Sequence, residues 1–396
     1  MGRETGFRYG LLAVILLVGL NLRGSIAAVS PLLPDIRADL HMSSAAAGLL
    51  TSLPVLCFAL GAPGAAWLGR RLGIYRALLL GCLVIALATV IRPYAGTWLL
   101  LGTTVLLGLA MTVGNVLMPV AIKRDFGSAA GRITGVSTAS LSTGAALAAA
   151  LTPALAVWLG WRHALAVWAV LGVVAAVALA RPAAQGRRSL SGPTTPTAPR
   201  SRGTGTGLRT NPVAWAVTAF LGLQSVTYYA VTAWMPTLLR DTAGLSLADA
   251  GLAMSLFQVL GIPGTLLVPV LIHRGRDQRA LGVTIGVAWL VMVLGLVVAP
   301  GLWPVWCVAG GIVQGMGISY AFTILVLRSA DDHVAARLSA MMQLLGYIVG
   351  ASGPFLVGLI QGATGSWTLA MIPVWLAAAG LVVSAMVAGR DRLVRV

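Results

Sequence analysis

Arg23 is the only charged side chain in the interior of any apolar run of membrane-spanning length, within the string LNLRGSIAAVSPLLPDIR. At a helical rise of about 1.5 Å per residue, it lies roughly 21 Å along the run that starts at Tyr9, whereas a bilayer core is about 30 Å thick. A guanidinium at that depth costs about 2.5–3.5 kcal/mol on insertion scales and usually faces a protein interior or a water-filled path. The sequence therefore predicts a functional cation here. The alternative is an arginine that hydrogen-bonds to carbonyls of a broken helix, or leans toward the outer surface, without touching a ligand.

Neutral polar side chains accompany Arg23 in the apolar runs: Asn21, Asn115, Gln224, Tyr228, Tyr229, Gln258, Gln314, Gln343 and Tyr347. Gln224 and Tyr228 are four residues apart, as are Gln343 and Tyr347, so each pair shares a helix face. One arginine among neutral hydrogen-bonding groups and aromatic rings is the composition of a small-anion site. Hydrogen bonding between helices explains any single amide or phenol equally well.

Acidic and metal-ligating residues are poorly placed for chemistry within the membrane. All ten acidic residues and all four histidines fall in loops or at helix ends, so no run offers a carboxylate for proton relay. A buried acid, histidine or nucleophile constellation for an intramembrane enzyme cannot be assembled. The three cysteines have no paired spacing, which argues against a disulfide framework and a metal site. We therefore expect no enzyme activity, no metal and no cofactor.

Composition indicates a polytopic membrane protein, because 58% of the 396 residues are hydrophobic, only 9% are charged and the mean hydropathy is +0.91. Despite a formal charge of +17, the basic residues form no stripe for nucleic acid. Most of them lie in alternate segments between apolar runs, which predicts that both termini are cytoplasmic.

Twelve apolar runs of membrane-spanning length occur at roughly 9–34, 45–68, 76–92, 97–122, 132–158, 162–181, 212–239, 247–272, 280–299, 302–327, 338–361 and 367–388. A Pro-, Gly-, Thr- and Arg-rich stretch at 182–211 predicts a flexible basic cytoplasmic linker between an N-terminal bundle, 1–181, and a C-terminal bundle, 212–396. Ala47-Gly48-Leu49 recurs six runs later as Ala250-Gly251-Leu252. Because six is even, the halves insert in the same orientation. The expected fold is an all-α integral membrane protein with two parallel-repeat six-helix bundles.

Four strings resemble the cyanate permease and 2-nitroimidazole exporter family of the major facilitator superfamily: LNLRGSIAAVSPLLPDIR, GNVLMPVAIKRDF at 114–126, LQSVTYYAVTAWMPTLLRD at 223–241 and ARLSAMMQLLGYIVGASGP at 336–354. The resemblance covers nearly the whole chain. It implies the twelve-helix major facilitator fold and an alternating-access carrier in the cytoplasmic membrane. The cavity candidates that it implies are Asn21, Arg23, Asn115, Gln224, Tyr228, Gln314, Gln343 and Tyr347.

Charged residues at the ends of the runs are gate candidates. Asp35 and Arg240 lie at matching outer ends of the first and seventh runs, where solvated helix ends are the plainer explanation. In the loop after the second run, Arg70 stands where the superfamily usually has an acid, while Arg71 and Gly73 remain. This departure puts the usual inner-gate charge relay in doubt.

We therefore predict a transporter of a small anionic or polar solute, of the cyanate-like or nitro-heterocycle class, bound by Arg23 in a central cavity. The alternative is a multidrug exporter for neutral compounds, and a membrane sensor or scaffold is disfavoured because the longest non-apolar stretch is the linker. The expected partners are a small-molecule substrate and the lipid bilayer. The expected state is a monomer in the bacterial inner membrane.

Overall fold

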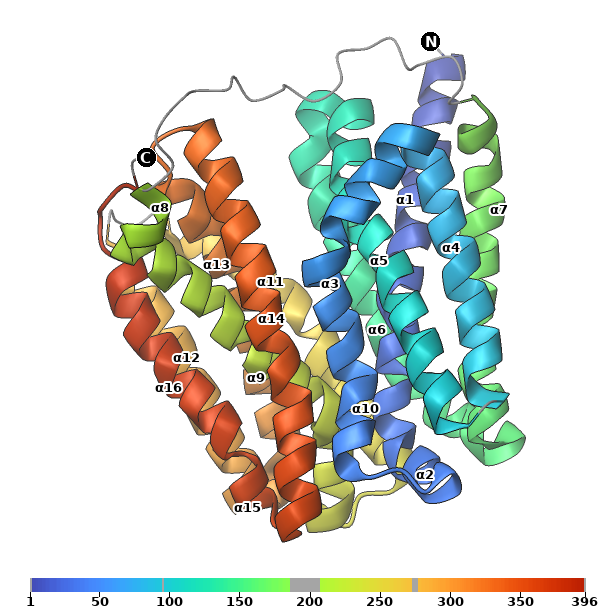
Figure 1. Cartoon of the computed structure of the whole chain (residues 1–396), viewed down its shortest axis with the longest axis vertical. Coiled ribbons are helices and arrows are strands. Elements are labelled where there is room, and N and C mark those ends of the chain that lie inside the picture. Colours follow the sequence, from blue (N-terminus) through green and yellow to red (C-terminus); the bar gives the residue numbers. More distant parts are fainter. Residues whose placement is uncertain (1, 95, 186–206, 273–276, 395–396) are drawn as a thin grey trace. The chain divides into compact units, whose positions relative to one another are not determined.

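The computed structural model describes the chain apart from residues 1, 95, 186–206, 273–276 and 395–396 (Figure 1). The described residues are almost entirely helical, and their only extended pairing is an isolated bridge between Ser329 and Val394. In chain order the elements are α1 (Gly2–Ala27), α2 (Val29–Leu40), α3 (Ser44–Leu72), α4 (Ile74–Ile91), η1 (Arg92–Tyr94), α5 (Thr97–Phe126), η2 (Gly127–Ala129), α6 (Ala130–Ala166), α7 (Ala169–Gln185), α8 (Gly207–Thr210), α9 (Pro212–Ala243), α10 (Leu247–Val259), α11 (Gly261–Ile272), α12 (Arg279–Val298), η4 (Pro300–Leu302), α13 (Trp303–Arg328), α14 (Asp332–Thr364), α15 (Trp367–Ala370) and α16 (Ile372–Ala388).

Nine helical stretches of the described chain are long and apolar enough to cross a membrane. One of them, Thr97–Ala166, holds α5 and α6, which are two passes, and α6 itself breaks at Gly160, where φ is +75°. The 17-residue α7 and the 32-residue α9 supply two more passes. The helices therefore match all twelve predicted runs, with α1–α2, α10–α11 and α15–α16 each forming one interrupted pass.

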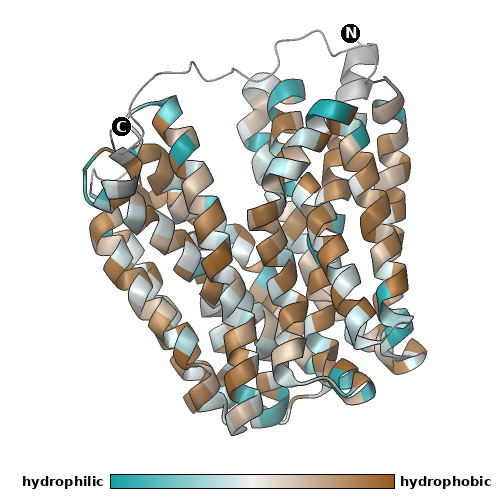
Figure 2. Cartoon of the chain, in the orientation of Figure 1, coloured by the Kyte–Doolittle hydropathy of each residue, from teal (hydrophilic) through white to brown (hydrophobic). Residues whose placement is uncertain are grey.

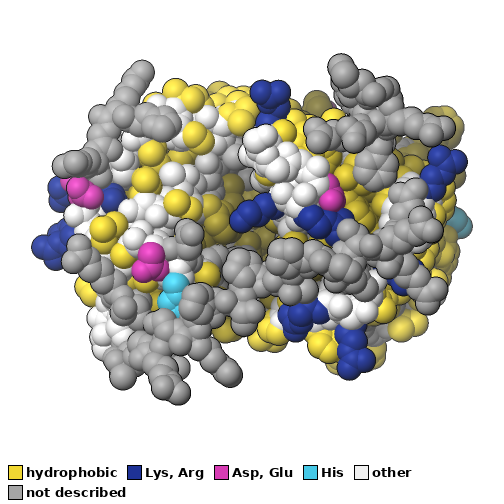
Figure 3. Space-filling model, turned by 90° about the horizontal axis from the view of Figure 1, so that it is seen from above, with side chains coloured by type: hydrophobic (Ala, Val, Ile, Leu, Met, Phe, Trp, Pro, Cys, Tyr) yellow, Lys and Arg dark blue, Asp and Glu magenta, His cyan; other side chains and the backbone are white. Residues whose placement is uncertain are grey.

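Hydrophobic residues follow the helices along most of their length, and hydrophilic residues are most frequent near helix ends (Figure 2). Two helices of the N-terminal half end in basic pairs, Arg70–Arg71 in α3 and Lys123–Arg124 in α5. Figure 3 looks onto the helix ends from above and shows Lys and Arg side chains more often than Asp and Glu. This distribution agrees with the charge bias in the sequence, while the side that faces the cytoplasm stays a prediction.

The helices group into two compact units. Unit 1 comprises residues 1–42, 60–193 and 247–255, and unit 2 comprises residues 43–59, 194–246 and 256–396. The first part of α3 thus packs with unit 2, and the first part of α10 with unit 1. Most of the predicted linker lies outside the described residues, so the division into bundles 1–181 and 212–396 stays a prediction.

Small residues let helix backbones approach closely within unit 1. A Cβ at Gly144 of α6 would overlap the carbonyl oxygen of Leu20 in α1, and one at Gly19 would overlap the Ser140 side chain. The Ser140 hydroxyl also donates to the carbonyl oxygen of Leu16 at 2.6 Å. Membrane helices lack a hydrophobic driving force for association, so such close packing and interhelical hydrogen bonds hold α1 against α6.

The repeated sequence phrase corresponds to a repeated contact. In unit 2, a Cβ at Gly48 of α3 would overlap the carbonyl oxygen of Pro354 in α14. In unit 1, a Cβ at Gly251 of α10 would overlap Pro153 of α6. Each glycine therefore packs its backbone directly against a proline-containing stretch, and the two glycines hold the same place in the repeat.

Candidate functional site

Arg23 and Asn115 lie at nearly the same depth of unit 1. Leu22 of α1 fills the space beside Gly114 of α5, where a Cβ would overlap the leucine side chain. The next residues along the two helices, Arg23 and Asn115, are therefore within about 3 Å of the same level, given a rise of about 1.5 Å per residue.

Exposure distinguishes this pair from its neighbours. Leu22 and Gly114 are buried, whereas Arg23 is half-buried and Asn115 is exposed. An amide exposed in the middle of an apolar helix is unfavourable against lipid, but not against water or a polar ligand. Together the two side chains offer a charged, planar hydrogen-bond donor and an amide that both donates and accepts.

Asn21 lies on another face of α1, about 160° around the helix axis from Arg23. It is 1% exposed, and its amide lies beside the Cys82 thiol of α4, which is a weak hydrogen-bond partner. Neither amide atom has a partner with full hydrogen-bond geometry. The structure therefore places Asn21 between α1 and α4 in the interior of unit 1, on a different face of α1 from Arg23.

Gln224 of α9 belongs to a buried hydrogen-bond network in unit 2. Its Nε2 donates to the carbonyl oxygen of Gln314 at 3.3 Å, and its Oε1 accepts from the indole N–H of Trp289 at 3.0 Å. The Gln314 amide is also buried and donates to the carbonyl oxygen of Phe257 at 3.5 Å. The network thus brings the two predicted residues together and uses their amide groups within the protein.

Tyr228, one turn after Gln224, is buried among aromatic rings. Its hydroxyl donates to Oε1 of Gln258 at 3.2 Å. Its ring centroid lies 4.9 Å from that of Tyr229 and 6.3 Å from that of Phe257. The shared face predicted for Gln224 and Tyr228 is therefore a packed interior face in this conformation.

Gln343 and Tyr347 of α14 are both half-buried. Gln343 donates from Nε2 to the hydroxyl of Ser339 in the same helix at 2.9 Å. The Tyr347 ring packs edge-to-face with Phe58, with ring centroids 6.1 Å apart. These two residues therefore keep part of their surface free of protein, unlike the network around Gln224.

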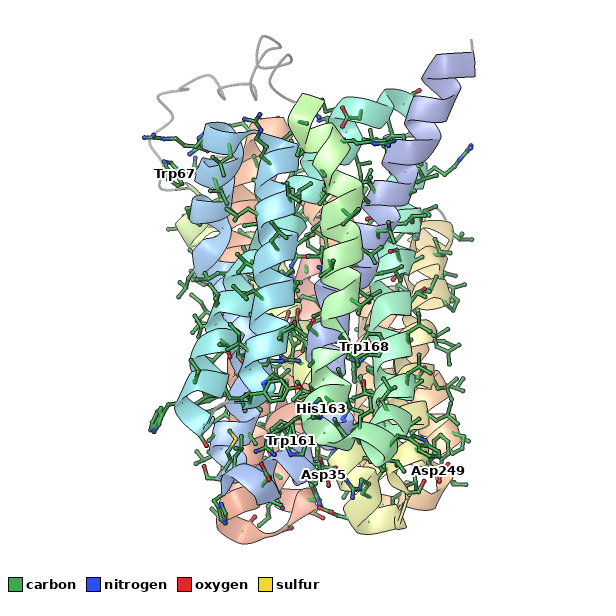
Figure 4. The ribbon with its side chains drawn as sticks, turned by 90° about the vertical axis from the view of Figure 1, so that its right-hand side faces the viewer. Asp35, Trp67, Trp161, His163, Trp168 and Asp249 are labelled. Carbon is green, nitrogen blue, oxygen red and sulfur yellow. The ribbon has the colours of Figure 1, made fainter. Side chains whose placement is uncertain are left out.

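The candidate gate residues are all at least partly accessible. Asp35 and Arg240 are half-buried but belong to different units, so an outer gate between them stays a prediction. Arg71 is exposed, with its guanidinium carbon 5.3 Å from the centroid of the Trp67 ring. Figure 4 shows Trp67 at the opposite end of unit 1 from Asp35 and Trp161. An inner position for Arg71 and an outer one for Asp35 are consistent with this arrangement.

Residues 15–354 match the sequence family described as Major Facilitator Superfamily. The chain belongs to the Major Facilitator Superfamily. Three relatives match over most of their length. The uncharacterized transporter YycB of Bacillus subtilis (strain 168) is 37% identical over 98% of this chain and 95% of the relative. A 2-nitroimidazole transporter of Escherichia coli (strain K12) is 34% identical over 98% of this chain and 97% of the relative. The cyanate transport protein CynX of Escherichia coli (strain K12) is 31% identical over 91% of this chain and 92% of the relative.

Solved structures show the same fold. A bacterial homologue of the human lysosomal transporter Spinster, in an inward-facing and unoccupied conformation, has a TM-score of 0.79 with 17% identity over 97% of this chain and 98% of that chain. A D-xylose–proton symporter has a TM-score of 0.73 with 16% identity over 98% of both chains. The predicted major facilitator fold and the predicted resemblance are confirmed. The chain is a multi-pass membrane transporter of a small molecule, and its superfamily consists of transporters, not enzymes.

Two interior residues of this Major Facilitator Superfamily member were not singled out by the sequence analysis. The indole N–H of Trp289 donates a hydrogen bond to Gln224. The sequence alone does not indicate which residue a tryptophan in an apolar run will contact. Arg92, the last residue of the third predicted run, is buried in unit 1. The sequence feature that could have pointed to Arg92 was the length of its run, because the run at 76–92 is the shortest of the twelve. Among the described residues, no group of three or more His, Cys, Asp or Glu could hold a metal ion.

Proposed function

We propose that this chain is an alternating-access transporter of a small anion or small planar polar solute, and that Arg23 is its principal binding residue. The observation that carries the proposal is the contact between Leu22 and Gly114, because it brings Arg23 and Asn115 to one level of unit 1. Both side chains remain at least partly accessible there.

The chemistry of the relatives' substrates supports this proposal. Cyanate is a small linear anion, and a nitroimidazole is planar and neutral with a nitro group that accepts hydrogen bonds. A guanidinium offers a planar fork of donors that fits both kinds of acceptor. Asn115 supplies a further donor in unit 1, and Gln343 and Tyr347, which are half-buried in unit 2, stay predicted contacts of the solute. The site thereby selects small acceptor-rich solutes over cations.

Uptake into proteoliposomes tests this proposal, with cyanate and 2-nitroimidazole as the probes. We expect Arg23→Ala to abolish cyanate transport, and Arg23→Lys to restore little because a lysine lacks the planar fork. The matched control is Arg162→Gln, which removes one positive charge from an exposed ion pair with Asp39 in the same unit. Unchanged cyanate transport in Arg23→Ala, at normal membrane abundance, would overturn the anion site.

Retention of nitroimidazole transport together with loss of cyanate transport in Arg23→Ala would limit the role of Arg23 to the charged substrate. If Arg23→Ala retains transport of both cyanate and nitroimidazole, this would favour the alternative, an exporter of neutral compounds that relies on the apolar walls of the bundles. Thermal-shift titration of purified protein with each solute gives a second readout, because a ligand that binds the folded state raises its melting temperature.

We further infer a bacterial inner-membrane protein that has both termini in the cytoplasm and functions as a monomer. The basic pairs at the ends of α3 and α5 support this orientation through the positive-inside rule. Fusing green fluorescent protein or alkaline phosphatase to the C-terminus tests it. A cytoplasmic terminus gives fluorescence without phosphatase activity, and the reverse pattern contradicts the orientation.

A further inference from the structure

Arg92 is a buried arginine that the proposed function does not use. It follows directly on α4 and is only 2% exposed. Its Nη2 donates to the carbonyl oxygen of Ser25 in α1 at 2.5 Å, and its Nε is enclosed without a hydrogen-bond partner. No carboxylate in the described part of the chain forms an ion pair with it. An arginine buried without an acidic partner is costly, so its place in the fold calls for an explanation.

The position of Arg92 along α1 is far from the end of that membrane pass. The pass continues from Ser25 through α2 to Leu40, whose carbonyl oxygen accepts a hydrogen bond from Thr97 at the start of α5. Arg92 lies at the end of α4, but it is buried and is therefore not a solvated residue. It reaches the level of the last turn of α1, only two residues beyond Arg23.

The last turn of α1 lacks one backbone hydrogen bond. Ala28, between the end of α1 at Ala27 and the start of α2 at Val29, keeps helical backbone angles, and its N–H donates to the carbonyl oxygen of Gly24. Pro31 has no backbone N–H, so it cannot donate to the carbonyl of Ala27 as a helix would require. A missing backbone hydrogen bond at a proline is a place where a helix can bend, and a contact from another element can fix its direction.

Helix α4 holds this turn at two points. Arg92 binds the Ser25 carbonyl, and Thr89, three residues earlier, has its hydroxyl 3.1 Å from the Ser25 hydroxyl. Thr89 and Ser25 are both buried. Ser25 and Arg23 differ by two residues and therefore point to opposite sides of α1. Fixing Ser25 against α4 consequently fixes the direction in which Arg23 leaves the helix.

We propose that Arg92 is a positioning residue for substrate binding: it anchors the last turn of α1 to α4 and thereby orients the Arg23 guanidinium. This inference rests on the proposed role of Arg23. It makes two separable statements, namely that Arg92 controls the orientation of position 23, and that this orientation sets substrate affinity.

The first statement is tested without substrate. Arg23→Cys is made in a chain whose native Cys57, Cys82 and Cys307 are replaced by alanine, and the rate of alkylation by a water-soluble maleimide is measured with and without Arg92→Gln. We expect Arg92→Gln to change the alkylation rate about tenfold, because an unanchored turn redistributes the exposure of position 23. The matched control is Arg328→Gln in unit 2, which also removes a buried guanidinium bound to backbone carbonyl oxygens. An equal change in both variants, or no change in Arg92→Gln, overturns the proposal.

The second statement is tested by transport kinetics with cyanate. We expect Arg92→Gln to raise KM about tenfold, equivalent to about 1.4 kcal/mol of binding free energy, with Vmax per folded molecule little changed. Arg92→Lys keeps a donor and a charge and should recover part of the affinity. A purely structural role would lower the amount of folded protein and leave KM unchanged, which would overturn the proposal.

Three further outcomes are decisive. Loss of binding in Arg92→Gln with an unchanged alkylation rate at position 23 would indicate that Arg92 contacts the solute itself, and would contradict positioning. If Arg23→Ala transports normally, the proposed function fails, but the alkylation experiment still decides whether Arg92 anchors α1. If Arg92→Gln does not fold, Arg92→Lys is carried through both measurements, and wild-type values in both overturn the proposal.

Discussion

The hydrogen bond between Gln224 and Trp289 allows a sharp test of whether Gln224 is a structural residue or a substrate contact. Gln224→Leu keeps the size of the side chain and removes both of its hydrogen bonds. The carbonyl of Gln314 lies within α13 and keeps its helical hydrogen bond, so the loss falls mainly on Trp289. That tryptophan is 0% exposed, and its indole N–H would have no partner.

The expected magnitude follows from this orphaned donor. An unsatisfied buried donor costs about 1–3 kcal/mol, whereas side-chain hydrogen bonds between membrane helices contribute nearer to about 0.6 kcal/mol, and about 1.7 kcal/mol at most. We therefore expect Gln224→Leu to lower the unfolding free energy by about 1–2 kcal/mol. At about 2–4 °C per kcal/mol for a unit of this size, the melting temperature should fall by about 2–8 °C.

A double-mutant cycle with Trp289→Phe assigns the loss to the pair. The assay is the fraction of detergent-solubilised protein that stays monodisperse in size-exclusion chromatography after heating. Once the acceptor is gone, removing the donor should cost less, with a coupling of about 0.5–1.5 kcal/mol. Gln343→Leu is the control, because Gln343 bonds only within its own helix. That variant should keep its melting temperature and raise KM.

Gln224→Leu should leave KM for the transported solute within about twofold of the wild-type value, since its amide is already occupied. An unchanged melting temperature, no coupling to Trp289 and a KM raised about tenfold would refute this reasoning. Gln224 would then contact the solute in another conformation of the transporter.

Three further predictions concern stability. Arg328→Gln should lower the unfolding free energy by about 2–4 kcal/mol in a thermal melt, because charge-assisted hydrogen bonds to two backbone carbonyls at the C-terminal end of α16 are lost; an unchanged melt contradicts this. Gly48→Val should destabilise this conformation by about 1–3 kcal/mol through overlap with α14, whereas Gly64→Val in the same helix meets no atom within 4 Å and should not. Hydrogen bonds from Arg279 lower the pKa of Asp277 from 3.8 to about 2, so any stability from this pair is present above pH 3.8 and is lost as the pH falls toward 2. The difference in melting temperature between wild type and Asp277→Asn should therefore be constant at all pH values well above 3.8 and shrink below it.

The arrangement of the passes could be predicted from the sequence because a bilayer imposes a length on every apolar segment. All twelve runs correspond to helices, although some ends differ: the first pass extends to Leu40 instead of 34, and α14 begins at Asp332 instead of 338. The depth of Arg23 follows from the same arithmetic, since it requires only a residue count and a helical rise.

The surroundings of the polar side chains could not be predicted in this way. Gln224 and Asn115 look alike in the sequence, as single amides in apolar runs, yet one is enclosed in a hydrogen-bond network and the other is exposed. What separates them is the helix packed against each, and Trp289 lies 65 residues from its partner. The burial of Arg92 could not be predicted for a related reason, because it depends on how far α1 and α2 extend past the end of α4.

The paired contacts of Gly48 and Gly251 bear on how readily the protein can change shape. Each joins segments from different halves of the sequence, so any motion that parted the predicted bundles would have to undo both. Gly48 meets backbone atoms of Pro354 and Phe355, and Gly251 meets the Ala149 carbonyl oxygen and the Pro153 ring. Neither glycine has a side chain that would have to change rotamer for these contacts to part. In the proposed alternating-access cycle, the solute would shift the balance only through a difference in its affinity for the two orientations.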